Sequence, residues 1–305
     1  MDRIEAMSAL LEVIKAGSFS AAARRLGVPP TSLARRVADL EAHLGARLLA
    51  RTTRSLSLTD AGSAYVAAAR RIVEDVEEAE RIVAGEYAAP RGELVITAPT
   101  MFGRLHVLPL VAEFLAAYPQ IDARLLLTDA LVHLVDERVD LAVRLGQLAD
   151  SSLVARRVGV MRTVVCASPS WLAAHGTPRK PQDVATLPTI AVGDIANQRH
   201  IWRFGDSQHD AVDVPIDPRM SVSSNEAATA AAVLGVGLTQ QRLYQVADHL
   251  ASGALRLCLT EFEPRPQPVH VLQTSRVHLP LKARKFTEFA IPRLQQRLAA
   301  LDTGA

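Results

Sequence analysis

The chain has 305 residues, a formal net charge of only +2 and a hydrophobic content of 49%. These values describe a folded globular protein of about two domains and exclude a polycation, so any binding to nucleic acid has to come from a local basic patch. No apolar run approaches the ~20 residues of a membrane span, and the charged N-terminus is not typical of a signal peptide. We therefore expect a cytoplasmic protein with no membrane partner.

Residues 1–58 predict a compact helical module. Apolar residues recur at helical spacing over residues 4–14, which indicates a first helix. Ser20 is predicted to cap a second, short helix that ends at Gly27, and a third helix carries an apolar stripe over residues 33–44. The other faces of this third helix are hydroxylic and basic, and hydroxyls followed one turn later by arginines suit base edges and phosphates.

A basic tip follows the third helix. Arg51 and Arg54 lie between two short extended stretches, a pattern typical of a β-wing. Over residues 1–58, nine basic residues stand against five acidic ones, an excess that suits the phosphates of DNA. The residues expected to contact double-stranded DNA are Ser20, Pro30, Thr31, Ser32, Arg35, Arg36, Arg51 and Arg54. The alternative is an ordinary helical hairpin with a solvated basic face.

A long helix is predicted next, capped by Thr59 and Asp60 and running to about residue 86. Its apolar side comprises Tyr65, Ala68, Ala69, Ile72, Val76, Ala79 and Val83. Because a small helical domain cannot bury such a side alone, we expect a second copy of the chain to pair with it, which would place two recognition helices on one face of the DNA. The alternative is that the helix packs on the next domain.

The order and spacing of short motifs across residues 18–62 resemble the N-terminal signature of the LysR-type transcriptional regulators. The motifs are SFSAAA (18–23), LG (26–27), LE (40–41), LG (44–45), LL (48–49), RT (51–52) and LTDAG (58–62). The resemblance implies a winged helix-turn-helix domain at residues 1–58, a linker and dimerisation helix at residues 59–89, a homodimer or homotetramer, and RNA polymerase as a candidate partner. Members often have polar side chains where Pro29 and Ala34 stand, so one helix cap and one DNA contact are expected to be missing.

Strands and helices alternate after a linker at residues 88–92, which predicts a mainly parallel α/β sheet. We expect two lobes, the first at about 90–160 and 268–305 and the second at about 161–267, with a ligand cleft between them. Motifs such as DLAVRLG (140–146) and GVG (235–237) resemble the effector-binding domain of the same family. The resemblance implies a fold similar to periplasmic solute-binding proteins at residues 90–305, and hence an α/β chain with an all-α N-terminal part.

The predicted cleft gathers hydroxyl groups at two helix starts, together with one arginine. Backbone N–H groups at a helix start attract anions, and Arg144 at a strand's carboxyl end would pair with a carboxylate. We therefore expect a small anionic metabolite as effector, bound by Thr97, Pro99, Thr100, Met101, Thr128, Arg144, Ser223 and Ser224. The alternatives are that each hydroxyl only caps a helix and that Arg144 bridges the lobes or neutralises Asp140. The polar stretch TQQR (239–242), where the family is apolar, is a further candidate for lining the pocket.

The sequence shows no pattern typical of catalysis, and we expect no cofactor. Cys166 and Cys258 are far apart in the sequence and have no metal-ligand spacing, and His200, His209, Asp206 and Asp210 fall in a stretch that is expected to be a solvated loop. Two other classes of protein remain open. One is a solute-binding or enzymatic α/β module whose helical N-terminus does not read DNA, and the other is a DNA-binding repressor that needs no ligand.

Overall fold

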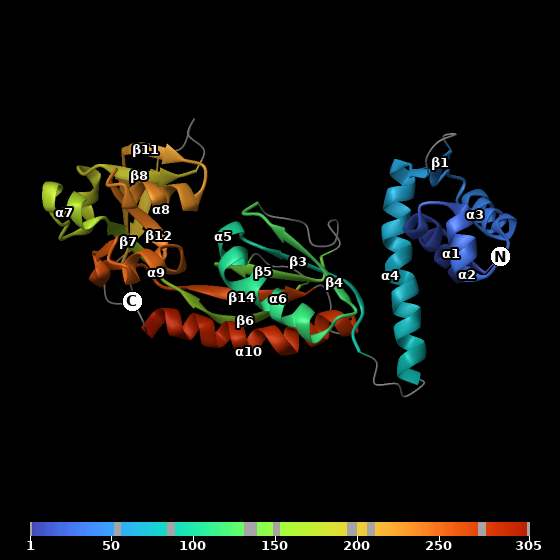
Figure 1. Cartoon of the computed structure of the whole chain (residues 1–305). Coiled ribbons are helices and arrows are strands. Elements are labelled where there is room, and N and C mark those ends of the chain that lie inside the picture. The colour runs from blue at the N-terminus through green and yellow to red at the C-terminus, as the bar shows by residue number, and fades with distance from the viewer. Residues whose placement is uncertain are drawn as a thin grey trace. The chain divides into compact units, whose positions relative to one another are not determined.

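The chain folds into two compact units, Met1–Ala89 and Pro90–Ala305, each with its own hydrophobic core (Figure 1). The computed structural model describes residues 2–51, 56–83, 89–130, 139–148, 153–193, 200–205, 211–273 and 279–303. Arg54 and the acidic and histidine side chains at 206, 209 and 210 lie outside these residues.

The N-terminal unit is built from three helices and a two-stranded wing. They are α1 (Arg3–Ala16), α2 (Phe19–Leu26), α3 (Pro30–Leu44), β1 (Leu49–Arg51) and β2 (Leu56–Leu58). The two strands pair antiparallel, with Leu49 opposite Leu58. Leu10, Leu33 and Leu40 are completely buried between the helices. The apolar spacing of the sequence thus gives three amphipathic helices that share one core.

The cap of α2 differs from the prediction. Ser18, not Ser20, is the N-cap residue, and its Oγ accepts a hydrogen bond of 3.1 Å from the Ala21 N–H. An N-cap side chain reaches the N–H two or three residues further along, and Ser20 already lies inside the helix with its side chain exposed. Pro29 caps α3 without a side-chain hydrogen bond, as the sequence predicts.

The long helix α4 (Asp60–Val83) is capped by Thr59, whose Oγ1 accepts the Gly62 N–H at 2.9 Å. Its first half packs on α1, where Val66 and Ala69 are buried. The expectation that this apolar side cannot be buried by its own domain is therefore wrong for the first turns. Further along, Ile72 is 41% exposed. Only this later part of the apolar side is available to a partner.

The first lobe of the C-terminal unit is a five-stranded sheet of order β4-β3-β5-β14-β6. The strands are β3 (Gly92–Ala98), β4 (Ile121–Leu127), β5 (Leu141–Leu145), β6 (Val154–Met161) and β14 (Gln267–Gln273). Strand β3 is parallel to β4 and β5, whereas β14 is antiparallel to β5 and β6. The sheet is therefore mixed, because β14 returns from the second lobe against the direction of its neighbours.

Helical segments cover one face of this sheet. They are α5 (Thr100–Phe102), the π-helical segment Gly103–Val107, α6 (Leu108–Ala117) and α10 (Leu281–Thr303), which runs along the lobe in Figure 1. Their aromatic side chains form the core, with the Phe114 and Phe286 rings 5.1 Å apart. The π-helical segment separates α5 from α6 within one continuous run of helical residues.

Among the described residues, the stretch Thr100–Ala117 is long and apolar enough to cross a membrane, and α1 with α2, bent by 116°, passes the same test. The stretch thus comes closer to the length of a membrane span than the sequence analysis expected. Phe102, Leu110 and Phe114 from this stretch are buried in the core of the first lobe. Its apolar character therefore serves packing against the sheet.

The second lobe has a five-stranded sheet of order β11-β8-β12-β7-β13. The strands are β7 (Thr163–Ala167), β8 (Thr189–Val192), β11 (Pro218–Val222), β12 (Leu238–Arg242) and β13 (Arg256–Cys258). Helices α7 (Pro169–His175), α8 (Asn225–Val233) and α9 (Leu243–Ala251) surround it, together with short 3-10 helices at Pro181–Ala185 and Thr260–Phe262. A hairpin of β9 (His200–Phe204) and β10 (Val212–Ile216) buries Trp202 and Phe204 in a second core with Trp171.

The chain passes between the lobes at two places that are joined by an ion pair. Arg162 lies between β6 and β7, and Glu263 lies before β14 on the return. The Arg162 Nε and Nη2 donate to the two Glu263 carboxylate oxygens at 2.8 and 2.9 Å. The two segments are therefore held together where the lobes meet.

DNA-facing helix and effector cleft

The start of α3 presents an exposed polar surface. Pro30 and Thr31 are exposed, Ser32 is half-buried, and the Arg35 side chain is 86% exposed. The Arg35 Nε lies 3.9 Å from Asp39 one turn further along the same helix. Since a surface pair at this distance holds an arginine only weakly, Arg35 is free to reach an external phosphate or base.

Arg36 has a different environment from Arg35. Its Nη2 lies 2.6 Å from Glu5 Oε1 on α1, and its side chain is 35% exposed. The structure therefore separates these predicted DNA contacts into an outward arginine and one that connects two helices. The Arg51 side chain and all of Arg54 lie outside the described residues.

Glu41 connects α3 to the start of β1, a role that was not predicted from the sequence. Its Oε1 accepts the backbone N–H groups of Leu48 and Leu49 at 2.8 and 3.0 Å, and Oε2 accepts Arg47 Nη1 at 3.2 Å. Burial raises the pKa of this carboxyl, but the hydrogen bonds from Leu49 and Leu48 and the Arg47 charge outweigh it and lower the pKa. A carboxylate next to the buried apolar stripe of α3 was the available signal. Glu41 fixes the wing to the end of α3.

In the first lobe, Thr97 is fully buried and its Oγ1 donates to the Leu126 carbonyl at 2.9 Å. Pro99 occupies the N-cap position of α5 without a side-chain hydrogen bond, and Met101 packs against the core. The Thr100 N–H donates to Asp129 Oδ1 at 3.1 Å. A carboxylate of the protein itself therefore occupies this helix start, which the sequence analysis had assigned to an anionic ligand. Asp129 follows Thr128 in the loop after β4 and was not among the residues predicted for the site.

Thr128 follows β4 and stabilises its own loop. Its backbone N–H donates to the Ala98 carbonyl at 3.0 Å. Its Oγ1 accepts the Ala130 N–H at 3.2 Å. Thr128 thereby connects the ends of β3 and β4, directly beside Asp129.

Arg144 on β5 makes contacts with neutral oxygens only. Its Nη1 donates to the Val143 carbonyl at 3.1 Å, and its Nη2 lies 3.5 Å from Thr97 Oγ1. Burial lowers the pKa of Arg144, and the negative charge of Asp129 partly opposes this shift. The Asp140 carboxylate accepts the Val95 N–H at 2.8 Å, so Asp129 is the acid whose charge acts on Arg144.

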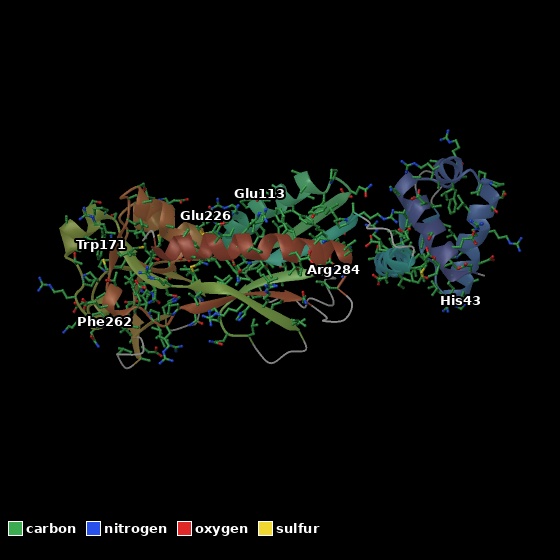
Figure 2. All side chains as sticks on the ribbon, turned by 90° about the horizontal axis from the view of Figure 1, so that it is seen from below. His43, Glu113, Trp171, Glu226, Phe262 and Arg284 are labelled. Atoms are coloured by element: carbon green, nitrogen blue, oxygen red, sulfur yellow. The ribbon has the colours of Figure 1, made fainter. Side chains whose placement is uncertain are left out.

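In the second lobe, Ser224 is the N-cap of α8, and its Oγ accepts the Ala227 N–H at 3.2 Å, whereas Ser223 is exposed. Glu226 in the first turn accepts a hydrogen bond of 3.1 Å from Arg104 Nη2 of the first lobe. Figure 2 labels Glu226 on the part of the second lobe that faces the first lobe. The start of α8 therefore lies beside the helical segment that carries Thr100.

The start of α9 completes the boundary between the lobes. The Tyr244 ring contacts the Phe102 and His106 rings of the first lobe at centroid distances of 5.2 and 5.7 Å. Burial and the negative charge of Asp129 raise the pKa of Tyr244 to about 12, against opposing effects of Arg242 and Gln245. The sequence had marked residues 239–242 as unusually polar, and Arg242 at their end lies against this tyrosine. The contact of Tyr244 with Phe102 could not be read from the sequence.

The cysteines are free and buried on neighbouring strands β7 and β13. Leu257 stands opposite Cys166 and Cys258 opposite Val165, so the two thiols point to opposite faces of the sheet. Burial raises the pKa of Cys166 to about 12 and that of Cys258 to about 11. Within the described ranges no three His, Cys, Asp or Glu side chains are grouped to hold a metal ion.

Comparison with known proteins agrees with this architecture. Residues 4–63 match the bacterial regulatory helix-turn-helix domain of the lysR family, and residues 88–295 match the LysR substrate binding domain. An HTH-type transcriptional regulator of Xanthomonas campestris pv. campestris (strain 8004) is 37% identical over 93% of this chain and 83% of its own length. An HTH-type transcriptional repressor of Pseudomonas aeruginosa (strain UCBPP-PA14) is 32% identical over 95% of this chain and 92% of its own.

A solved structure gives the same result. The structure of CrgA, a LysR-type transcriptional regulator from Neisseria meningitidis, superposes with a TM-score of 0.61 and is 31% identical. The superposition covers 95% of this chain and 98% of the CrgA chain. These relatives are regulators and not enzymes, which decides against the enzymatic alternative. The chain belongs to the LysR family of transcriptional regulators, with an N-terminal helix-turn-helix domain and a C-terminal effector-binding domain.

Proposed function

We propose that this regulator binds a specific DNA sequence by inserting residues 31–36 at the start of α3 into the major groove. The exposure of Pro30, Thr31 and Arg35 in the first turns of α3, opposite its buried apolar stripe, supports this orientation. The wing, with Arg51 and Arg54, would then contact the phosphate backbone or the minor groove. Glu41 supports the arrangement because it fixes the wing to the same helix.

The active form is a homodimer or a homotetramer, built through the helix of residues 59–89 and the effector-binding domains. The exposed Ile72 on the later part of the α4 apolar side supports this pairing, since a second copy of the helix would remove that side from water. The protein acts in the cytoplasm, where RNA polymerase is a candidate partner.

A small anionic metabolite in the cleft between the lobes controls the regulator. The half-buried guanidinium of Arg144, which has only neutral oxygens as hydrogen-bond partners among the described residues, supports an anion. A ligand shifts an equilibrium only by its different affinity for the two states, so the effector has to favour one arrangement of the two lobes.

Selection of genomic DNA fragments with the purified protein, followed by footprinting, tests this function. We expect protected sites with two half-sites about one helical turn apart and an affinity that falls steeply with salt. A monomer that ignores duplex DNA at low ionic strength would contradict the proposal and leave a small-molecule binder.

A further inference from the structure

Two arginines lie where the two lobes meet, and neither forms an ion pair with a carboxylate among the described residues. Arg242, the N-cap residue of α9, is half-buried, and its Nη1 has no hydrogen-bond partner among the described residues. Burial lowers the pKa of this arginine. Buried guanidinium N–H groups without an acceptor are costly, so such a group indicates a place where an acceptor from outside binds.

Arg144 brings a second guanidinium of the same kind from the first lobe. Its hydrogen-bond partners among the described residues, the Val143 carbonyl and the Thr97 hydroxyl, carry no charge. Within the described part of the chain, no carboxylate lies within ion-pair distance of Arg144. Two arginines, one from each lobe, therefore lack an anionic partner.

Among the described residues, Asp129 is the carboxylate whose charge acts on Arg144 and on Tyr244. Its field reaches both Arg144 and the Tyr244 hydroxyl, and the charge of Arg242 acts on the same hydroxyl. Asp129 is exposed, and one of its oxygens accepts the Thr100 N–H. Asp129 thus acts on Arg144 and Tyr244, and Arg242 acts on Tyr244, so the three charged groups surround the start of α9.

From this arrangement we infer that the effector is a small hydroxy acid, with one carboxylate that pairs with Arg242 and Arg144 and a hydroxyl that donates to Asp129. The inference rests on the proposed role of the cleft and specifies the chemistry of its ligand. A second carboxylate would stand next to the negative charge of Asp129, which disfavours dicarboxylates. A neutral ligand would leave the arginines without an ionic partner.

Thermal unfolding of the full chain in the presence of small acids tests the inferred effector chemistry. Four sets of acids are compared on the same carbon skeletons, both aliphatic and aromatic. The probes are hydroxy acids, the same acids without the hydroxyl, the corresponding dicarboxylates and the corresponding amino acids. We expect a hydroxy acid to raise the melting temperature most, because binding to the native state alone stabilises it. An equal or larger shift with any other set, or no shift with any hydroxy acid, overturns the inference.

Two variants extend the test. Arg242→Gln should abolish the shift without lowering the melting temperature of the unliganded chain, because it removes a desolvated charge. Arg256→Gln, at an exposed position of the same lobe, is the matched control and should keep the shift. Asp129→Asn removes the negative charge and should tighten the binding of the corresponding dicarboxylate by about tenfold. Unchanged dicarboxylate binding by Asp129→Asn would overturn the role of Asp129.

DNA binding by the same preparations separates this inference from the proposed function. If the chain binds its operator while no hydroxy acid stabilises it, only the chemistry assigned to the effector fails. If it also ignores duplex DNA, the proposed function fails as well.

Discussion

Arg162 and Glu263 form a two-pronged ion pair at the place where the chain crosses between the two lobes. Arg203 and Asp213 form a pair of similar geometry, 2.8 and 3.1 Å, on the β9–β10 hairpin. The two pairs differ in burial, because the Arg162 and Glu263 side chains are 21% and 14% exposed and those of Arg203 and Asp213 are 71% and 47% exposed. The chain therefore contains its own control for the effect of burial on an ion pair.

We predict that Glu263→Ala lowers the free energy of unfolding of the C-terminal domain by about 2 kcal/mol, since a charged donor loses its acceptors in a poorly solvated place. Asp213→Ala should cost much less than Glu263→Ala, because water replaces an exposed partner. Urea unfolding of both variants measures the difference. Equal losses would mean that burial at the crossing has no effect.

Glu41→Gln should lower the stability of the N-terminal domain by about 1 kcal/mol at neutral pH, because the two backbone N–H groups of the wing lose a charged acceptor. The folded pKa of Glu41 lies below its ordinary value of 4.5, so its contribution to stability is present above that pH and is lost as the pH falls through the lower folded pKa.

Urea unfolding of the wild type and Glu41→Gln over a pH series checks this sign. The gap between the two proteins should be constant at neutral pH and shrink below about 4.5. A gap that widens on acidification would show that the protonated carboxyl, and not the carboxylate, holds the wing.

Arg35→Ala and Arg54→Ala should each weaken operator binding and reduce the slope of log affinity against log salt by about 1, while the dimer stays intact. The exposed Arg35 side chain makes no contact on which the fold depends. Gel-shift titrations at several salt concentrations provide the measurement. Arg124→Ala on β4 of the effector domain is the control, and the assigned orientation is wrong if the footprints of both DNA-domain variants are unchanged.

Ile72→Glu should convert the dimer into a monomer and reduce DNA affinity, because it places a charge on the later part of the α4 apolar side. The fold of the monomer should survive, since Ile72 is already partly exposed. Arg70→Glu, about half a turn away on the same helix, is the control and should leave the dimer intact. Sedimentation velocity distinguishes the monomer from the dimer for both variants. A dimeric Ile72→Glu variant would show that the dimer interface lies elsewhere.

The sequence by itself determined the elements of the N-terminal domain and its family. Helices α1 to α3 depend on local signals, namely an apolar residue every three or four positions and a glycine directly after the last residue of each helix. Such signals act within a few residues along the chain. Even there, the cap was placed two residues too late at Ser20, because serines at 18 and 20 both precede the same apolar run.

Only the tertiary structure decided which polar groups meet at the boundary between the lobes. Thr97 looked like a ligand-binding hydroxyl in sequence, but its strand lies beside β4 and its hydroxyl bonds to Leu126. Asp129 and Tyr244 are far apart along the chain and act on each other because the end of β4 and the start of α9 lie at the same boundary. Hydrophobic periodicity specifies which face of an element is buried, but not which element will cover it, and that choice brings Asp129 and Tyr244 together.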